Sequence, residues 1–170
     1  MKFFLVATLA LTGLVVVTLV VGAALPATRA GTVTRDLQAP MEIVHSTIRD
    51  IARQPDWRAN IAAIAPGPDG TWTEITQSGE RITFRLTEVQ PTRIALFFES
   101  TRGYTGQWQA DLTTTDAGGT RLTVTEQATT PSPLGRVLSR LFFDPKAFAA
   151  AYLDELGAET ARRSLDRGNP

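Results

Sequence analysis

The sequence predicts an α+β fold in which an antiparallel sheet of seven strands packs on a long carboxy-terminal helix, preceded by one transmembrane helix. Three observations lead to this fold class. The chain begins with an uncharged apolar run, continues as short alternating stretches separated by glycine- and proline-rich turns, and ends with helical periodicity. We therefore expect a transmembrane helix with a short linker over residues 1–29 and one domain over residues 30–170.

Composition excludes several classes of function. The 170 residues hold 17 basic and 17 acidic side chains, so no net field draws the chain toward nucleic acid. Cysteine is absent and His45 is the single histidine, which excludes disulfides, thiolate metal sites and a histidine-rich metal centre. Walker loops, dinucleotide fingerprints and nucleophile elbows do not occur. We therefore expect neither a metal nor another cofactor.

The segment from Phe3 to Thr28 contains no charged residue and predicts a membrane-spanning helix. About 20 apolar residues cross the hydrocarbon layer, and this run is long enough even when it is tilted. A cleaved secretory signal is the alternative, but the apolar core of such signals usually has about 7 to 15 residues. We expect a single-pass anchor with an extracytoplasmic domain, because Lys2 favours a cytoplasmic amino terminus, although Arg29 and Arg35 favour the opposite orientation.

The domain is expected to begin with a strand and an amphipathic helix. Residues 31–38 form the first strand, and Pro40 suits the first turn of the helix that follows. Apolar residues then recur at helical spacing and predict one stripe that faces a core, formed by Met41, Val44, Ile48 and Ile51. This helix should end at Gln54-Pro55, because proline cannot continue it.

The rest of the domain is expected to be a meander of strands closed by helices. Six extended stretches lie at residues 59–65, 71–77, 80–89, 93–101, 105–114 and 119–129. The turns between them are short, so neighbouring strands should be antiparallel. Two helices follow, at 133–143 and from Pro145 to about Arg167. The second is amphipathic and should cover the apolar face of the sheet.

Several short motifs accompany this order of elements. They are Ala39-Pro40 followed by Val44, Asp50, Pro55 and Trp57, then Trp108, the hairpin residues 119–126, and the links 133–136 and 141–143. Together they resemble the START and polyketide cyclase-like (SRPBCC) superfamily over residues 31 to about 166. The resemblance implies a helix-grip fold, in which a curved sheet wraps the long helix and encloses a cavity for a hydrophobic small molecule or lipid. His45 departs from the family pattern, where an aromatic residue is common.

The candidate cavity residues are large apolar side chains and one carboxylate: Trp57, Phe84, Phe98, Trp108, Glu126, Phe148 and Tyr152. Glu126 and Glu88 each continue an apolar alternation, so both are expected on the apolar face of the sheet. Burying an unpaired carboxylate is costly, and strand-end ion pairs with Arg81, Arg85 or Arg121 are favoured over a role in ligand binding. The tryptophans more often fill a core than stack on a ligand, and for His45 a flank of the helix is favoured over a role in the cavity.

The sequence thus predicts a membrane-anchored domain that binds a hydrophobic small molecule or lipid and no nucleic acid. No catalytic residue is assigned, and a binding protein is favoured over an enzyme. One alternative is a cyclase or aromatase in which His45 or Glu126 is the general acid or base. The other is a non-catalytic module that binds a protein partner in a membrane complex through the 102–107 loop or the outer sheet face.

Overall fold

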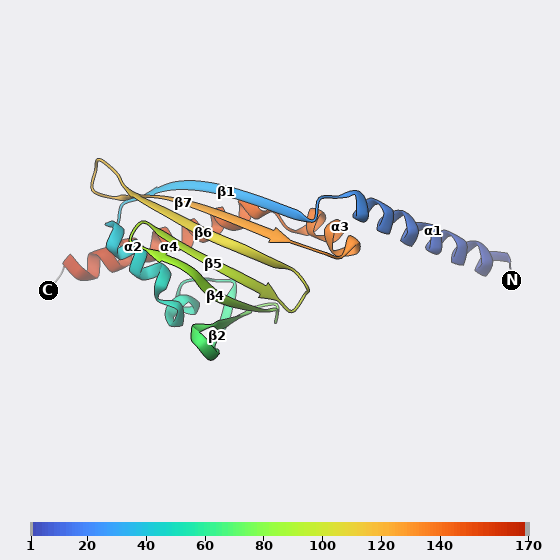
Figure 1. The fold of residues 1–170 in the computed structure, drawn as a ribbon, viewed down its shortest axis with the longest axis horizontal. Helices are drawn as coiled ribbons and strands as arrows, with labels where there is room; N and C mark the ends of the chain where they lie inside the picture. The colour runs from blue at the N-terminus through green and yellow to red at the C-terminus, as the bar shows by residue number, and fades with distance from the viewer. Residues whose placement is uncertain (1, 169–170) are drawn as a thin grey trace.

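The computed structural model describes residues 2–168, in which one sheet of seven antiparallel strands carries helices on one face and at one end (Figure 1). The strand order is β1-β7-β6-β5-β4-β3-β2, so β2 to β7 form a meander and β1 pairs with β7. The predicted α+β class and seven-stranded sheet are confirmed. The strands are β1 (Thr28–Leu37), β2 (Ile61–Pro66), β3 (Trp72–Thr76), β4 (Arg81–Gln90), β5 (Arg93–Ser100), β6 (Thr105–Thr114) and β7 (Thr120–Thr129).

Three of the four described α-helices begin at a proline or directly after one. The four are α1 (Lys2–Ala24), α2 (Met41–Arg49), α3 (Pro133–Phe142) and α4 (Pro145–Gly168), with short 3₁₀ helices η1 (Ile51–Asp56) and η2 (Pro68–Gly70). The prediction of one helix that ends at Gln54-Pro55 is wrong: Asp50 leaves helical geometry with a ψ of 67°, so α2 ends at Arg49. Ile51, the last residue of the predicted stripe, starts η1, which contains Pro55. The long carboxy-terminal helix is confirmed as α4.

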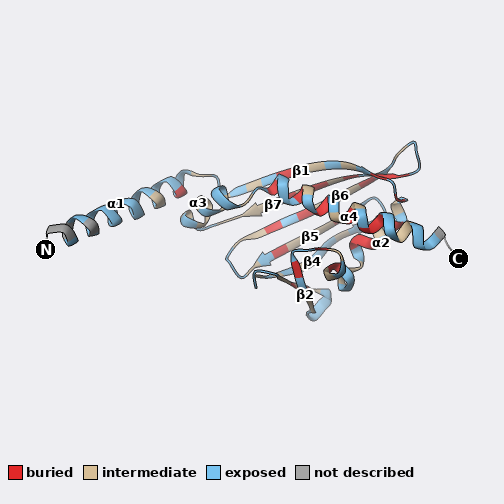
Figure 2. Ribbon diagram, turned by 180° about the vertical axis from the view of Figure 1, so that it is seen from behind, coloured by how far each residue is buried: buried red, intermediate tan, exposed pale blue. Residues whose placement is uncertain are grey.

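The core lies between α4, α2 and one side of the sheet. Helix α4 packs against β1 and β7, and α2 packs against α4 and β6; the buried residues in Figure 2 lie along these elements. Arg163 fixes the two helices together by donating to Glu159 in its own helix and to Asp50 at the end of α2, at 2.6 and 3.0 Å. The fully buried apolar side chains include Val44, Leu112, Leu122, Val124, Leu153 and Leu156.

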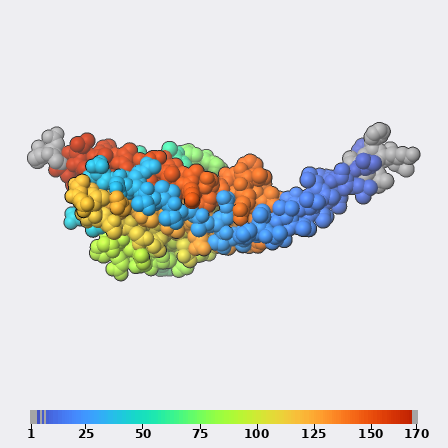
Figure 3. Space-filling view, turned by 90° about the horizontal axis from the view of Figure 1, so that it is seen from above, coloured from blue at the N-terminus to red at the C-terminus, as the bar shows by residue number. Residues whose placement is uncertain are grey.

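Helix α1 projects from one end of the domain beside α3 (Figures 1 and 3). Arg136 of α3 joins the two, because its guanidinium donates to the carbonyl oxygens of Ala23 in α1 at 3.4 Å and of Leu25 directly after it at 3.2 Å. Among residues 2–168, no helix has the length and apolarity needed to cross a bilayer. The transmembrane helix predicted over residues 1–29 is therefore not supported.

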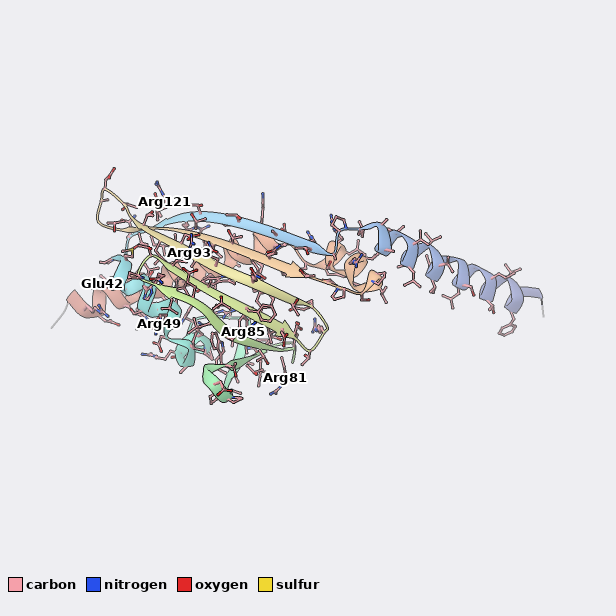
Figure 4. All side chains as sticks on the ribbon, in the orientation of Figure 1. Glu42, Arg49, Arg81, Arg85, Arg93 and Arg121 are labelled. Atoms are coloured by element: carbon pink, nitrogen blue, oxygen red, sulfur yellow. The ribbon has the colours of Figure 1, made fainter. Side chains whose placement is uncertain are left out.

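The outer face of the sheet carries exposed arginines, of which Figure 4 labels those from β4, β5 and β7. Arg121 forms a bidentate pair with Asp36, with both N–O distances at 2.7 Å. Arg85 lies over the ring of Phe97 at 4.7 Å. These side chains interact on the outer face, so neither arginine neutralises a carboxylate on the opposite, helix-facing side.

A β-bulge in β4 reverses the face that its second half presents. Leu86 pairs with Leu96, but Glu88 pairs with Ala95, so Thr87 is an extra residue in the strand. Residues opposite one another share a face of the sheet, and the bulge therefore places Glu88 on the face opposite to Leu86. The prediction that Glu88 lies on the apolar face is wrong, and of the two expected carboxylates only Glu126 lies there.

Candidate ligand-binding cavity

A cavity of about 940 Å³ lies on the helix-facing side of the sheet. Strands β3, β4 and β5 form much of its wall, η1 and α4 contribute from the sides, and α3 lies at one end. Some inward side chains of these strands keep accessible surface because they face a hollow: Leu86 is 41% exposed although it lies on the apolar face. The wall from β3 to β5 includes Trp72, Ile82, Phe84, Leu86, Ile94, Leu96 and Phe98.

Most of the predicted site residues line this cavity. The structure places Phe84, Phe98, Trp108, Glu126, Phe148 and Tyr152 in its wall. Trp57 is not part of the wall formed by the described residues; it packs behind the wall on the Tyr152 ring, with the ring centroids 5.9 Å apart. The role of Trp57 in ligand binding stays a prediction, because an aromatic side chain after a helix can point to either side of the element it packs on.

His45 does not line the cavity formed by residues 2–168 either. Its Nε2 lies 3.1 Å from the carbonyl oxygen of Gln90, at the far end of β4. This position agrees with the structural interpretation of His45 as a flank of α2.

Aromatic side chains from neighbouring strands form a continuous apolar wall. Trp72 stacks on Phe84 at 5.6 Å between centroids with only 9° between the ring planes. Phe84 contacts Phe98 at 5.5 Å, and Phe98 meets Tyr104 edge-on at 6.3 Å. Gly106 makes this possible, because a Cβ there would collide with the Phe98 ring. Such interlocked rings present a fixed apolar surface to a ligand.

A buried ion pair forms the polar part of the wall and was missed by the sequence analysis. Arg58 Nη1 donates to Glu74 Oε1 at 2.8 Å, and both side chains are buried. Arg58 Nη1 also donates to Gln54 Oε1, and its guanidinium carbon lies 5.5 Å from the centre of the Tyr152 ring. The alternation of Trp72 and Glu74 in β3 is a signal for Glu74, whereas Arg58 follows a 3₁₀ helix and has no periodic signal.

Glu126 is the unusual group of this cavity. It lies on β7 opposite Trp108 of β6 and is 5% exposed. Its Oε2 is buried and has no hydrogen-bond partner among the described residues. Burial raises the pKa of Glu126 to about 7; Arg58 lowers that pKa and Glu74 raises it further. The ion pair expected with Arg81, Arg85 or Arg121 is not formed in the described chain, and the expectation is corrected.

The far end of the wall holds a second polar group, built on Glu80. Ser100 donates its hydroxyl to Glu80 Oε1, and Arg102 approaches Glu80 Oε2 at 3.4 Å. Burial, with Glu80 nearby, raises the pKa of Tyr104 well above its usual range, so this phenol stays neutral. Glu80 is thus already engaged by neighbouring donors, in contrast to Glu126. Within the described part of the chain, acidic, histidine and cysteine side chains form no cluster that could hold a metal ion.

Residues 28–163 match the family model described as polyketide cyclase / dehydrase and lipid transport. The chain belongs to this family. The match begins with β1 and ends within α4, so it spans every element that lines the cavity. A comparison with curated proteins finds no match.

Solved structures share the fold at low sequence identity. The Zhui aromatase/cyclase from Streptomyces sp. R1128 aligns over 81% of this chain and 96% of its own, with a TM-score of 0.66 and 16% identity. A norcoclaurine synthase from Thalictrum flavum, solved with a transition-state analogue, covers 81% and 96%, with a TM-score of 0.65 and 10% identity. A START superfamily protein from Mycobacterium smegmatis covers 78% and 97%, with a TM-score of 0.60 and 13% identity. The family membership and these likenesses establish the helix-grip fold implied by the sequence motifs.

Proposed function

We propose that this domain binds a hydrophobic small molecule or lipid in the cavity between the sheet and α4. The observation that carries the proposal is a cavity of about 940 Å³ walled mainly by aromatic and aliphatic side chains. Ligand sites in proteins typically have volumes of about 300–1,000 Å³ and are lined in this way. The family description includes lipid transport, and a norcoclaurine synthase of the same fold was solved in complex with dopamine and hydroxybenzaldehyde.

Titration of the full chain with the neutral apolar dye Nile red tests this proposal. We expect saturable fluorescence enhancement with one dye per chain. Ala128 lines the cavity and Ala95 lies on the outer face, so Ala128→Leu and Ala95→Leu add the same atoms inside and outside the cavity. The first substitution should weaken binding severalfold and the second should leave it unchanged. Non-saturable binding, or equal effects of the two substitutions, would contradict a site in this cavity.

A cyclase or aromatase-type reaction is the second candidate, and Glu126 favours it. A carboxyl with a pKa of about 7 in an apolar cavity exchanges a proton near neutral pH at little cost. The Zhui aromatase/cyclase shares the fold. Dehydration of a β-hydroxy ketone probe, measured as a change in absorbance, tests this candidate. If this candidate is right, Glu126→Gln abolishes turnover. His45→Ala changes a side chain outside the cavity and leaves turnover intact. Equal rates in the parent chain and both variants would contradict a catalytic role of Glu126.

We also propose a location at a membrane, with the domain on the extracytoplasmic side. Apolar side chains of α1 are exposed along its described length, among them Leu9, Leu14, Val17 and Val20. Large exposed apolar surfaces are typical of membrane or protein contacts. Cell fractionation and protease digestion of sealed vesicles test this location. Recovery of the full chain in the soluble fraction would contradict attachment to a membrane. Protection of the domain from protease in sealed vesicles that enclose cytoplasm would contradict an extracytoplasmic orientation.

A further inference from the structure

The polar part of the cavity wall indicates which chemical class of ligand it accepts, and this inference rests on the function proposed above. We propose that the ligand is an apolar molecule that presents a hydrogen-bond-donating group, a hydroxyl or a protonated amine, to Oε2 of Glu126.

The first argument is the unsatisfied oxygen of Glu126. Most buried polar atoms in folded proteins have a hydrogen-bond partner, and leaving one without a partner is costly. Glu126 is buried in the cavity wall, and its Oε2 finds no partner within residues 2–168. The contrast with Glu80 is direct, because Glu80 lines the same cavity and accepts from Ser100. Glu126 is therefore the place in the wall where a ligand group gains most by donating a hydrogen bond.

The second argument is the charge around Glu126. The charged groups that act on Glu126 from neighbouring elements are Arg58, after η1, and Glu74, in β3. Arg58 Nη1 is already engaged by Glu74 and Gln54. An anionic ligand group would therefore meet two carboxylates and one paired cation, whereas a hydroxyl meets no repulsion and an amine brings the net charge of the group to zero.

The third argument concerns the other titratable groups that face this part of the cavity. Burial raises the pKa of Tyr152 in α4, with Arg58 lowering it and Glu74 raising it, and the pKa of Tyr104 beside β6 is raised mainly by burial. Both phenols are therefore neutral at physiological pH and do not compensate the charge of an ionised Glu126. The rings of Trp108 and Tyr152, 5.5 Å apart and edge-on, provide the apolar surroundings for the ligand body, and aromatic faces also accommodate cations.

A matched series of ten-carbon compounds tests the inference: decane, 1-decanol, decylamine, decanoic acid and 2-decanone. Displacement of Nile red from the full chain is measured for each compound at pH 8, below its aqueous solubility limit and, for the ionised amine and acid, below the micelle concentration. We expect the alcohol and the amine to displace the dye at about tenfold lower concentration than decane, the acid or the ketone, since hydrogen bonds to charged groups are worth about this much.

Two carboxylate substitutions provide the matched controls. Glu126→Leu replaces the carboxylate by an apolar side chain of similar size. In this variant the alcohol and the amine should displace the dye at about the same concentration as decane, so their tenfold advantage is lost. Glu88→Leu makes the same change on the outer face and should preserve the advantage. Preservation of the advantage in Glu126→Leu would overturn the assignment of Glu126.

The outcomes separate this inference from the proposed function. Tighter binding of the acid or the ketone than of the alcohol and amine would overturn the inference. Equal binding of all five compounds would overturn it as well, but would leave a hydrophobic binding cavity in place. If neither Nile red nor any compound of the series binds, the proposed function itself fails.

Discussion

Along part of β6 and β7 the inward side chains pack against helices, whereas under β3, β4 and β5, and at Trp108 of β6 and Glu126 of β7, they line a cavity; these two regions are the solid end and the hollow end of the domain. At the solid end, Leu122 of β7 and Leu153 of α4 are fully buried. At the hollow end, Phe84 and Leu86 of β4 line open space. Both regions have the same period-two alternation. The comparison shows that alternation determines which face of a strand is apolar, while the placement of α4 and α2 determines whether that face becomes core or ligand wall.

The solid and hollow ends also differ in whether their buried polar groups have hydrogen-bond partners. At the solid end, Thr120 is fully buried and its hydroxyl donates to the carbonyl oxygen of Ala39 at 2.8 Å. At the hollow end, Glu126 is buried with an oxygen that has no partner in the described chain. A satisfied buried group contributes to a stable core, whereas an unsatisfied one raises the free energy of the unliganded state. The hollow end is thus the part of the domain that gains most from a bound molecule.

The largest expected effect comes from truncating one leucine at each end. Leu122→Ala should lower the free energy of unfolding by about 2–5 kcal/mol, because a close-packed core retains the vacated volume as a cavity. Leu86→Ala should cost less than about 1 kcal/mol, since Leu86 already borders open space. Urea denaturation of the two variants measures the difference. Equal losses would mean that the two ends are packed alike.

A smaller effect is expected from the pH dependence of Glu126. The pKa of this carboxyl is about 7 in the folded chain against its ordinary value of 4.5, so between these values the folded chain holds a proton that the unfolded chain has lost. Stability therefore falls as the pH rises from 4.5 to 7, by up to roughly 3 kcal/mol.

Glu126→Gln removes the titrating carboxyl and should flatten the dependence of stability on pH. The measurement is the change in urea midpoint between pH 5 and pH 8, compared with the parent chain. The carboxyl of Glu159 acts in the opposite sense, because hydrogen bonds from Arg162 and Arg163 lower its pKa and its stabilisation is lost as the pH falls. That contribution is common to both proteins and cancels in the comparison. A parallel pH dependence of the two proteins would refute the burial of an unpaired carboxyl.

The smallest of the three effects comes from enlarging one alanine at each end. Ala110 is fully buried in β6, and Ala128 lines the cavity from β7. Ala110→Leu should destabilise the chain by about 1–3 kcal/mol through overpacking. Ala128→Leu should change the thermal midpoint little, because the added atoms enter the hollow. A larger loss in Ala128→Leu than in Ala110→Leu would show that the hollow end is closed.

Sequence alone predicts the framework of this fold well, for reasons that particular residues illustrate. Turn residues and alternation are local, so the strands lie within a few residues of their predicted bounds. Glu126 was correctly expected on the apolar face because it continues the alternation of Leu122 and Val124. Glu88 was not, because the extra residue Thr87 reverses the face and has no signature of its own in the sequence.

The parts of the site that the sequence does not predict depend on contacts between distant segments. Arg58 reaches the cavity from the turn after η1 and pairs with Glu74 of β3. Trp57 is aromatic and adjacent to Arg58, yet it packs behind Tyr152. Local pattern does not distinguish these two neighbours, because the direction of each side chain is set by the packing of η1 against the rest of the domain.

Quenching of individual tryptophans by 1-bromodecane tests the hollow end most directly, since bromine quenches indole fluorescence on contact. Trp72 and Trp108 line the cavity, whereas Trp57 lies behind its wall. The structure predicts saturable quenching that persists in Trp57→Phe and is largely lost when Trp72 and Trp108 are both changed to Phe. Quenching that disappears in Trp57→Phe, or that never saturates, would contradict a ligand cavity beneath β3, β4 and β5.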